Sequence, residues 1–207
     1  MLNRQDLQGL LFFDVETTRG HNAWDELSPV LQRQWERRAK RLYKKHLEEE
    51  GWTLAQTWAE YAGIPAEYSR VVCISAGYLS FGANGEPPVP SVKSFAGTDE
   101  RAVLADFAEL LRGYMNKKFQ RLCGHNIREF DVPVLARRML IQNLSPLPPG
   151  LAVWGLKPWE VPHIDTMDMW RFGDFKAYTS LELLAASLGV PTPKQDIDGS
   201  QVGRVFW

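Results

Sequence analysis

The sequence predicts an α/β fold in which a mixed β-sheet carries helices on its faces. Three observations lead to this prediction. Short runs rich in β-forming residues alternate along the chain with longer stretches of helical periodicity. The first run, residues 10–13, is entirely apolar, which is typical of a strand buried on both faces. With 207 residues and a hydrophobic content of 44%, the chain is large enough for a domain with a real core.

Residues 21–68 interrupt this pattern and predict a helical insertion after the first strand. Ser28 and Pro29 are typical of a helix start. The stretch that follows repeats apolar residues at helical spacing: Leu31, Trp35, Ala39 and Leu42. A second short helix is expected where apolar residues share one face: Leu54, Trp58 and Tyr61. We expect the tryptophans of this insertion to form a core rather than a cofactor site.

The rest of the chain predicts two strands and a helix, followed by two strand–helix pairs. The strands are expected at 71–81, 91–95, 121–124 and within 163–170. The helices are expected at 98–115, 130–143 and 179–191, with Thr98 and Thr179 as N-caps. The Pro-rich residues 143–162 are expected to form a loop.

Charge and composition exclude several classes of protein. The net charge of −1 gives no overall attraction for nucleic acid, so binding of a polyanion would need a local patch. The two cysteines suit neither a disulfide framework nor a zinc site. The apolar stretch near the N-terminus is too short to span a bilayer, so we expect a cytoplasmic protein without a membrane partner.

Two carboxylates, Asp14 and Glu16, follow the first apolar run directly. Because strand side chains alternate, both point to the same face, and two like charges at that spacing repel unless a cation lies between them. The carboxyl edge of an open α/β sheet is also where ligands bind. Thr17 and Thr18 come next and could bond a phosphate or a terminal sugar. The alternative is an acid pair that caps a turn or binds an arginine.

A third carboxylate, Asp131, stands at the predicted start of a helix, two residues before Pro133. Taken alone, an aspartate there is explained as a helix N-cap. However, Gly124, His125 and Asn126 follow another predicted strand, so this segment opens at the same sheet edge. The third carboxylate could therefore reach the same cation.

Together these segments resemble a known enzyme family. "FDVETT" with "GHNIREFDVPVLARR" resembles motifs I and II of the DEDD 3′–5′ exonuclease superfamily. The stretch beginning "HIDTMDMW" is similar to the bacterial branch related to the exonuclease domain of B-family DNA polymerases. The resemblance covers nearly the whole chain. It implies a ribonuclease-H-like, three-layer fold over one domain, residues 1–207, with the central mixed sheet flanked by helices and residues 21–68 inserted.

The resemblance also implies a reaction and roles for the site residues. Asp14 and Glu16 would bind the catalytic metal, and Asp131 would help to hold a second ion. The residues expected to contact substrate are Thr17, Thr18, Asn126 and Phe130. Oxygen ligands suit Mg²⁺ or Mn²⁺, and two such ions can assist attack on a phosphodiester. The expected activity is hydrolysis from the 3′ end of single-stranded DNA, releasing nucleoside monophosphates.

The family's fourth acid is not found in the sequence. In the related branch it lies in a Tyr-x-x-x-Asp motif on a later helix, and no such motif occurs before Trp207. Three interpretations remain open: a shortened exonuclease, a catalytically incomplete module that binds nucleic acid or metal, or an internal substitute such as Asp165 or Asp168. Loss of that helix would expose part of the sheet, so we also expect a homo-oligomer or low stability.

Several basic or titratable residues have two interpretations each. Residues 33–46 contain seven Lys and Arg, which form either a solvated helix face or an arm that contacts phosphates, with Trp35 or Tyr43 stacking on bases. Arg137 and Arg138 either face solvent or reach a substrate phosphate. His125 acts either as a general base or as a support for the turn at Asn126.

Overall fold

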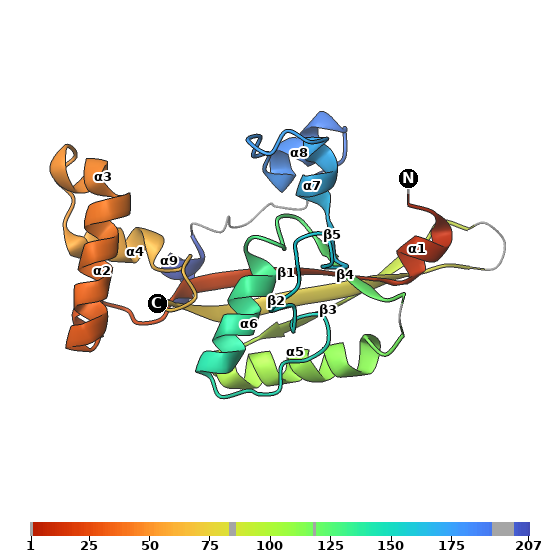
Figure 1. The fold of residues 1–207 in the computed structure, drawn as a ribbon, viewed down its shortest axis with the longest axis horizontal. Coiled ribbons are helices and arrows are strands. Elements are labelled where there is room, and N and C mark those ends of the chain that lie inside the picture. Colours follow the sequence, from red (N-terminus) through yellow and green to blue (C-terminus); the bar gives the residue numbers. More distant parts are fainter. Residues whose placement is uncertain (1, 83–85, 118, 192–200) are drawn as a thin grey trace.

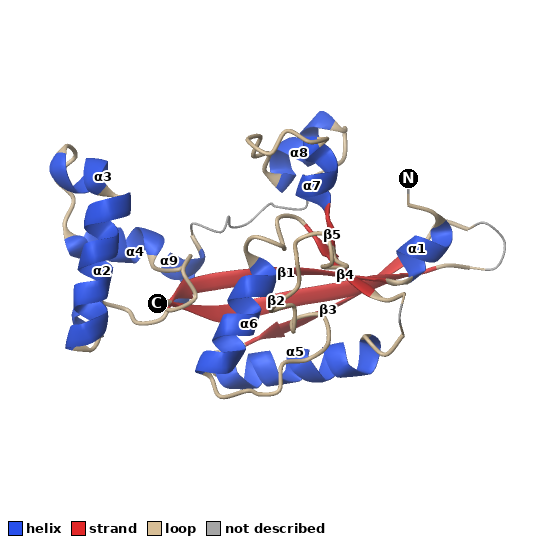
Figure 2. Ribbon diagram, viewed as in Figure 1, coloured by secondary structure: helices blue, strands red, loops and turns tan. Residues whose placement is uncertain are grey.

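The computed structural model describes residues 2–82, 86–117, 119–191 and 201–207, and its centre is a mixed sheet. Five strands lie in the order β3-β2-β1-β4-β5 (Figures 1 and 2). They are β1 (Leu10–Arg19), β2 (Ser69–Ser80), β3 (Val89–Ala96), β4 (Arg121–Gly124) and β5 (Ile164–Asp165). β1, β2 and β3 pair antiparallel, whereas β4 and β5 run parallel to β1. The predicted α/β fold with a mixed sheet is confirmed.

Strand β1 is longer than its apolar run indicates. It continues to Arg19 because β2 pairs with it all the way, from Phe12 opposite Gly77 to Arg19 opposite Ser69. Asp14 and Glu16 therefore lie inside the strand, and the expectation that they follow its end was wrong. The pairing register shifts between Glu16 and Thr17, which is a β-bulge at the second acid.

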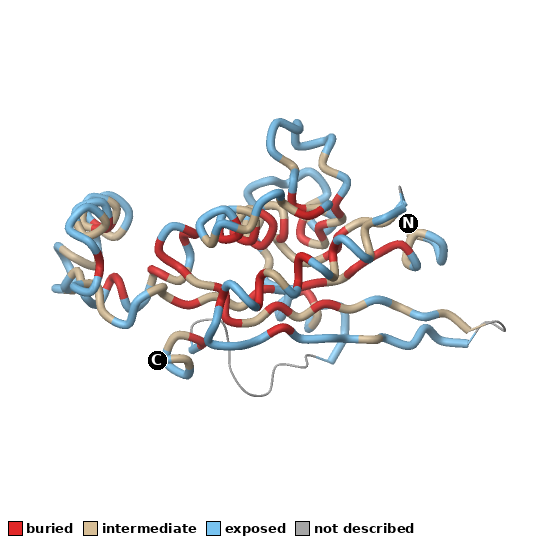
Figure 3. Tube along the Cα trace, turned by 90° about the horizontal axis from the view of Figure 1, so that it is seen from below, coloured by how far each residue is buried: buried red, intermediate tan, exposed pale blue. Residues whose placement is uncertain are grey.

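The main core lies where one face of the sheet meets two helices, α5 (Glu100–Tyr114) and α6 (Asp131–Ile141). Buried residues gather in this central region, while the far end of the β2–β3 hairpin is largely exposed (Figure 3). Phe13 and Val15 contribute from β1, since alternate residues of a strand share a face. The residues between and beside them, Phe12, Asp14 and Glu16, consequently point to the opposite face, which is only partly covered.

A buried ion pair joins the two core helices. Arg138 of α6 donates to Glu100 of α5 through Nε at 2.8 Å and Nη2 at 2.5 Å. The backbone N–H of Val71 and the side chain of Gln142 also donate to this carboxylate. Arg138 is only 7% exposed, so neither expectation for it, a solvated side chain or a phosphate contact, was correct. Its neighbour Arg137 is exposed, as the solvated interpretation predicts.

The helical insertion between β1 and β2 has its own small core. It contains a short 3₁₀ helix η1 (Trp24–Glu26) and the helices α2 (Pro29–Leu42), α3 (Lys44–Glu48) and α4 (Leu54–Tyr61). Trp35 packs edge-on against Trp58 and Tyr68, each at 5.1 Å between ring centroids. Trp35 is fully buried, so its predicted use in base stacking was wrong. Tyr43 stacks on Tyr61 instead, at 4.1 Å.

Four further short helices complete the described chain: α1 (Arg4–Gln8), α7 (Thr166–Arg171), α8 (Leu181–Ser187) and α9 (Val202–Phe206). The predicted N-caps of α5 and α8 were each one residue early. Asp99 accepts from the N–H of Ala102 at 3.2 Å, and Ser180 accepts from that of Leu183 at 3.2 Å. None of the described helices has both the length and the apolar character needed to cross a membrane.

Candidate functional site

The site lies where strand β1 extends beyond the end of its parallel neighbour, β4. β4 ends at Gly124, and its last partner on β1 is Phe12, opposite Cys123. Asp14 and Glu16 therefore lie beyond the carboxyl end of β4, although β1 itself continues. This is the position at which open α/β sheets leave a crevice for ligands. Gly124 allows the chain to turn away there, because a Cβ on it would lie 2.7 Å from the carbonyl oxygen of Phe13.

Asp131 reaches the same part of β1 from helix α6. The helix begins at Asp131, with Phe130 as its N-cap residue, so the explanation of Asp131 as a simple N-cap was wrong. Its Oδ1 accepts a hydrogen bond of 3.1 Å from the backbone N–H of Val15, which lies between Asp14 and Glu16. Asp131 is 3% exposed. The structure thus brings the third acid to the strand that carries the first two.

Among the residues that the structure describes, no positive side chain forms an ion pair with Asp131. Burial, together with the nearby negative charge of Asp14, raises its pKa to about 7. The hydrogen bond from Val15 favours the ionised form but does not offset burial. A cation bound between Asp14 and Asp131 would relieve this repulsion and favour the ionised carboxyl group.

The carboxylate oxygens at this position suit a hard divalent cation, but the three acids are not grouped as a metal site in the described structure. The three acids offer only carboxylate oxygens, which Mg²⁺ and Mn²⁺ prefer. Across the ranges that the structure describes, however, no three His, Cys, Asp or Glu side chains are grouped closely enough to hold a metal ion.

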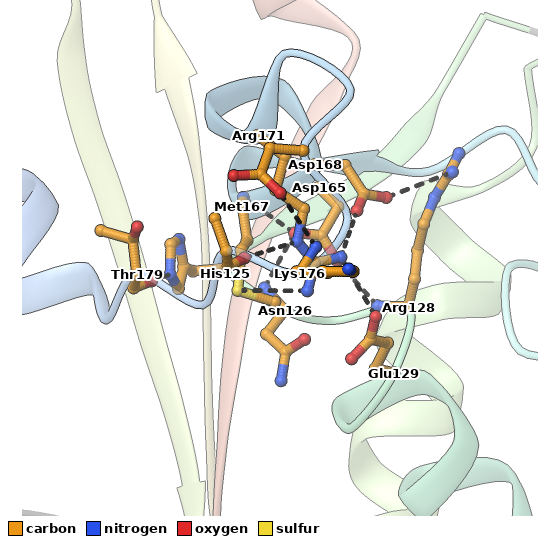
Figure 4. A network of polar contacts seen from close by, with 12 residues as sticks. His125, Asn126, Arg128, Glu129, Asp165, Met167, Asp168, Arg171, Lys176 and Thr179 are labelled. Carbon is orange, nitrogen blue, oxygen red and sulfur yellow. Dashed lines mark hydrogen bonds and ion pairs between the residues drawn. The ribbon is translucent and has the colours of Figure 1, made fainter.

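The turn between β4 and α6 is held by a network from β5 and α7 (Figure 4). Asp165 accepts from the backbone N–H groups of Asn126 at 2.8 Å and of Arg128 at 3.0 Å. It also caps α7 by accepting from Met167 at 3.0 Å. These bonds stabilise Asn126 in a left-handed conformation, with φ of 64°. Asp165 is thus a positioning residue, and the signal for it in the sequence is an aspartate directly before a helix.

The other side chains of this network also have hydrogen-bond or ion-pair partners. His125 contacts Thr166 Oγ1 through Nδ1 at 2.9 Å and the carbonyl oxygen of Thr179 through Nε2 at 2.7 Å. This arrangement agrees with a support for the turn and leaves no ring nitrogen for a general base. Asp168 pairs with Arg128 and Arg171 (Figure 4). The carboxylates of Asp165 and Asp168, the two candidates for a substitute fourth acid, thus both have partners within this network.

Only some of the residues predicted to contact substrate lie near the acids. Asn126 lies on the turn that leads to Asp131, and Phe130 is partly buried against the main core. Thr17 donates to the carbonyl oxygen of Gly63 at 2.8 Å. Thr18 is 2% exposed, with Gly203 of α9 packed against it, so the structure does not bring Thr18 to the surface near the acids.

The sheet order and strand directions define an α/β protein with a five-stranded mixed sheet flanked by helices. A family model described as "predicted 3′–5′ exonuclease related to the exonuclease domain of PolB" matches residues 62–207, and the chain belongs to this family. The matched part contains Asn126 and Asp131 but not β1 with Asp14 and Glu16.

Other comparisons found only distant similarity. No curated protein matches the chain significantly. Two solved structures are similar at 12% identity: exonuclease I without ligand, with a TM-score of 0.43, and product-bound exonuclease I, with a TM-score of 0.45. The alignments cover 88% and 94% of this chain. The chain spans 37% and 41% of the exonuclease I chains, which is less than half of their length.

Proposed function

We propose that this protein is a cytoplasmic, divalent-metal-dependent exonuclease that acts at the 3′ end of single-stranded DNA. It would hydrolyse the terminal phosphodiester bond and release nucleoside monophosphates one at a time. One observation carries the proposal: the buried carboxylate of Asp131 is hydrogen-bonded to Val15, the residue between Asp14 and Glu16. Membership of a family of predicted 3′–5′ exonucleases supports the reaction class.

In this proposal the residues would have the following roles. Asp14, Glu16 and Asp131 would hold Mg²⁺ or Mn²⁺, in a pair of ions that would activate water and stabilise the departing 3′ oxygen. Asp131 keeps its place through the N–H of Val15, so its distance from the strand is fixed before substrate binds. Asn126 and Phe130 precede the same acid in the chain and would contact the terminal nucleotide.

A second candidate function is a module that binds metal and nucleic acid without cutting. The partners of Asp165 and Asp168 favour it, because both carboxylates, the candidates for a fourth acid, are already engaged in hydrogen bonds or ion pairs. The two functions differ in product release rather than in binding.

The test is an exonuclease assay on 5′-labelled single-stranded DNA with Mg²⁺ or Mn²⁺. We expect a ladder of 3′-shortened products, with the rate lowered on the order of a hundredfold or more in Asp14→Ala and Asp131→Ala, since even outer partners of a metal site cost 10–100-fold. Asp106→Ala is the control, because it removes an exposed carboxylate of α5. A ladder that survives Asp14→Ala would reject this site. Metal binding by calorimetry without any ladder would establish the second function instead.

A further inference from the structure

The molecule has a second surface of marked charge, at the junction of the insertion with the main domain. Two adjoining hollows of about 480 and 540 Å³ share Leu31, Glu67 and Tyr68. They lie between helix α2, the start of β2 and the ends of α5 and α6. We call this surface the arginine groove, because six arginines line it: Arg37, Arg38, Arg41, Arg70, Arg101 and Arg138.

The charge of the groove is unbalanced. Its carboxylates are Glu67, Asp99 and Glu100. Glu100 is neutralised by Arg138 in the floor, and Asp99 caps helix α5. Five arginines therefore face two remaining carboxylates, in a protein whose net charge is −1. Such a local excess of positive charge is what a polyanion requires.

Helix α2 presents three of these arginines on one face. Gln34, Arg37, Arg38 and Arg41 follow the i, i+3, i+4, i+7 spacing, and all four line the same hollow. Within the described ranges, the three arginines form no ion pair. The lysines on the neighbouring positions do, since Lys40 pairs with Glu36 at 2.7 Å and Lys44 with Glu48 at 3.5 Å. Lys40 of α2 and Lys44 of α3 are thus paired, whereas the three arginines of the groove keep their charge unpaired within the described residues.

Two of the arginines also carry buried donors that nothing in the described chain satisfies. They are Nε of Arg38 and Nε of Arg70. Buried donors usually find an acceptor, so these two guanidinium groups retain hydrogen-bonding capacity that the described chain does not use. Phosphate oxygens are acceptors that arginine binds well, because its fork of N–H groups matches their geometry.

The groove also lies within reach of the acids. Glu16 lies in β1, which ends at Arg19, and the next residue, Gly20, lines the groove. Four residues at strand spacing span about 13 Å. Figure 1 shows the insertion beyond this end of β1. Successive phosphates of one strand lie about 3.4 Å apart along the axis of B-form DNA, and a single strand can extend further, so this distance corresponds to about four nucleotides or fewer.

We propose that the arginine groove binds the phosphodiester backbone of a single strand, several nucleotides away from the end held at the acids. The contact is independent of sequence. It does not depend on the proposed catalysis, and it would hold equally for a chain that binds without cutting.

The test measures binding of a labelled oligodeoxythymidine of about twenty nucleotides by fluorescence anisotropy, in EDTA and at several salt concentrations. The variant is Arg37→Gln with Arg41→Gln. The matched control is Arg33→Gln with Lys40→Gln, which removes the same charge from exposed positions of the same helix outside the groove. Thermal melting of each variant checks that it is folded.

We expect the groove variant to bind on the order of tenfold more weakly at moderate salt. Its slope of log affinity against log salt should be shallower by about 1.4, or about 0.7 for each lost phosphate contact. The control should change neither quantity by as much. Equal losses in variant and control would overturn the proposal, as would wild-type protein that does not bind the strand. An equal loss of affinity for a nucleoside monophosphate would also overturn it, because that would indicate a site for a small anion.

Discussion

The buried pair of Glu100 and Arg138 gives the sharpest prediction about stability. Arg138→Met keeps most of the aliphatic volume but removes the guanidinium group. That group donates twice to Glu100 and once to the carbonyl oxygen of Ala66, at 2.9 Å. The change leaves a carboxylate that is 4% exposed without its counter-charge.

The structure sets the size of the expected loss. Removing one member of a buried ion pair typically costs about 3–5 kcal/mol. Glu100 keeps the N–H of Val71 at 2.8 Å and the side chain of Gln142 at 2.6 Å. We therefore expect the lower end, about 3 kcal/mol of unfolding free energy. Glu100→Gln added to Arg138→Met should recover part of this loss, because the stranded charge is then absent.

Urea unfolding followed by circular dichroism measures these differences, with metal excluded. The control is Arg137→Met, which changes the adjacent, exposed arginine of the same helix and should stay within about 0.5 kcal/mol of wild type. If Arg138→Met costs no more than Arg137→Met, the pair does not stabilise the junction of α5 and α6, and the reasoning fails.

Two further predictions concern the site itself. Because the pKa of Asp131 is raised to about 7, its carboxyl group destabilises the fold as pH rises from about 4 towards 7, and the full cost remains above pH 7. In EDTA, Asp131→Asn should therefore be more stable than wild type at pH 8, by up to about 3 kcal/mol, with no difference near pH 4; urea titrations that differ equally at both pH values would contradict this. Gly124→Ala should lower the melting temperature, because its Cβ would lie 2.7 Å from the Phe13 carbonyl oxygen and 2.3 Å from Ile127 Cγ2, and an unchanged melting temperature would show that this turn has room to adjust.

Periodicity in the sequence was enough to predict the sheet and the core helices. It failed where a charged residue lies inside an element. Aspartate and glutamate are uncommon in strands, so Asp14 indicated the end of β1, yet pairing with β2 extends the strand to Arg19. A local sequence pattern does not reveal which distant strand will pair with a segment, so it could not predict this extension.

The roles of Asp131 and Arg138 depended on contacts across the fold. The sequence showed that Asp131 stands at a helix start, but its hydrogen bond goes to Val15, far away along the chain. Arg137 and Arg138 are adjacent and chemically identical, and only the packing of α6 on α5 decides which one is buried. Which of two neighbouring side chains is buried is therefore decided by tertiary structure and not by the local sequence.

The unequal lengths of β1 and β4 have a consequence for how this site can change during evolution. Beyond Gly124, no strand of the described chain pairs with this edge of β1, and the carboxylate of Asp131 accepts from the N–H of Val15 that another strand would otherwise use. One side chain thus substitutes for a stretch of main chain. Lengthening β4 by a residue or two would place backbone where that carboxylate now lies. The position of the acid therefore depends on where strand β4 ends. We expect β4 to tolerate substitutions far better than insertions.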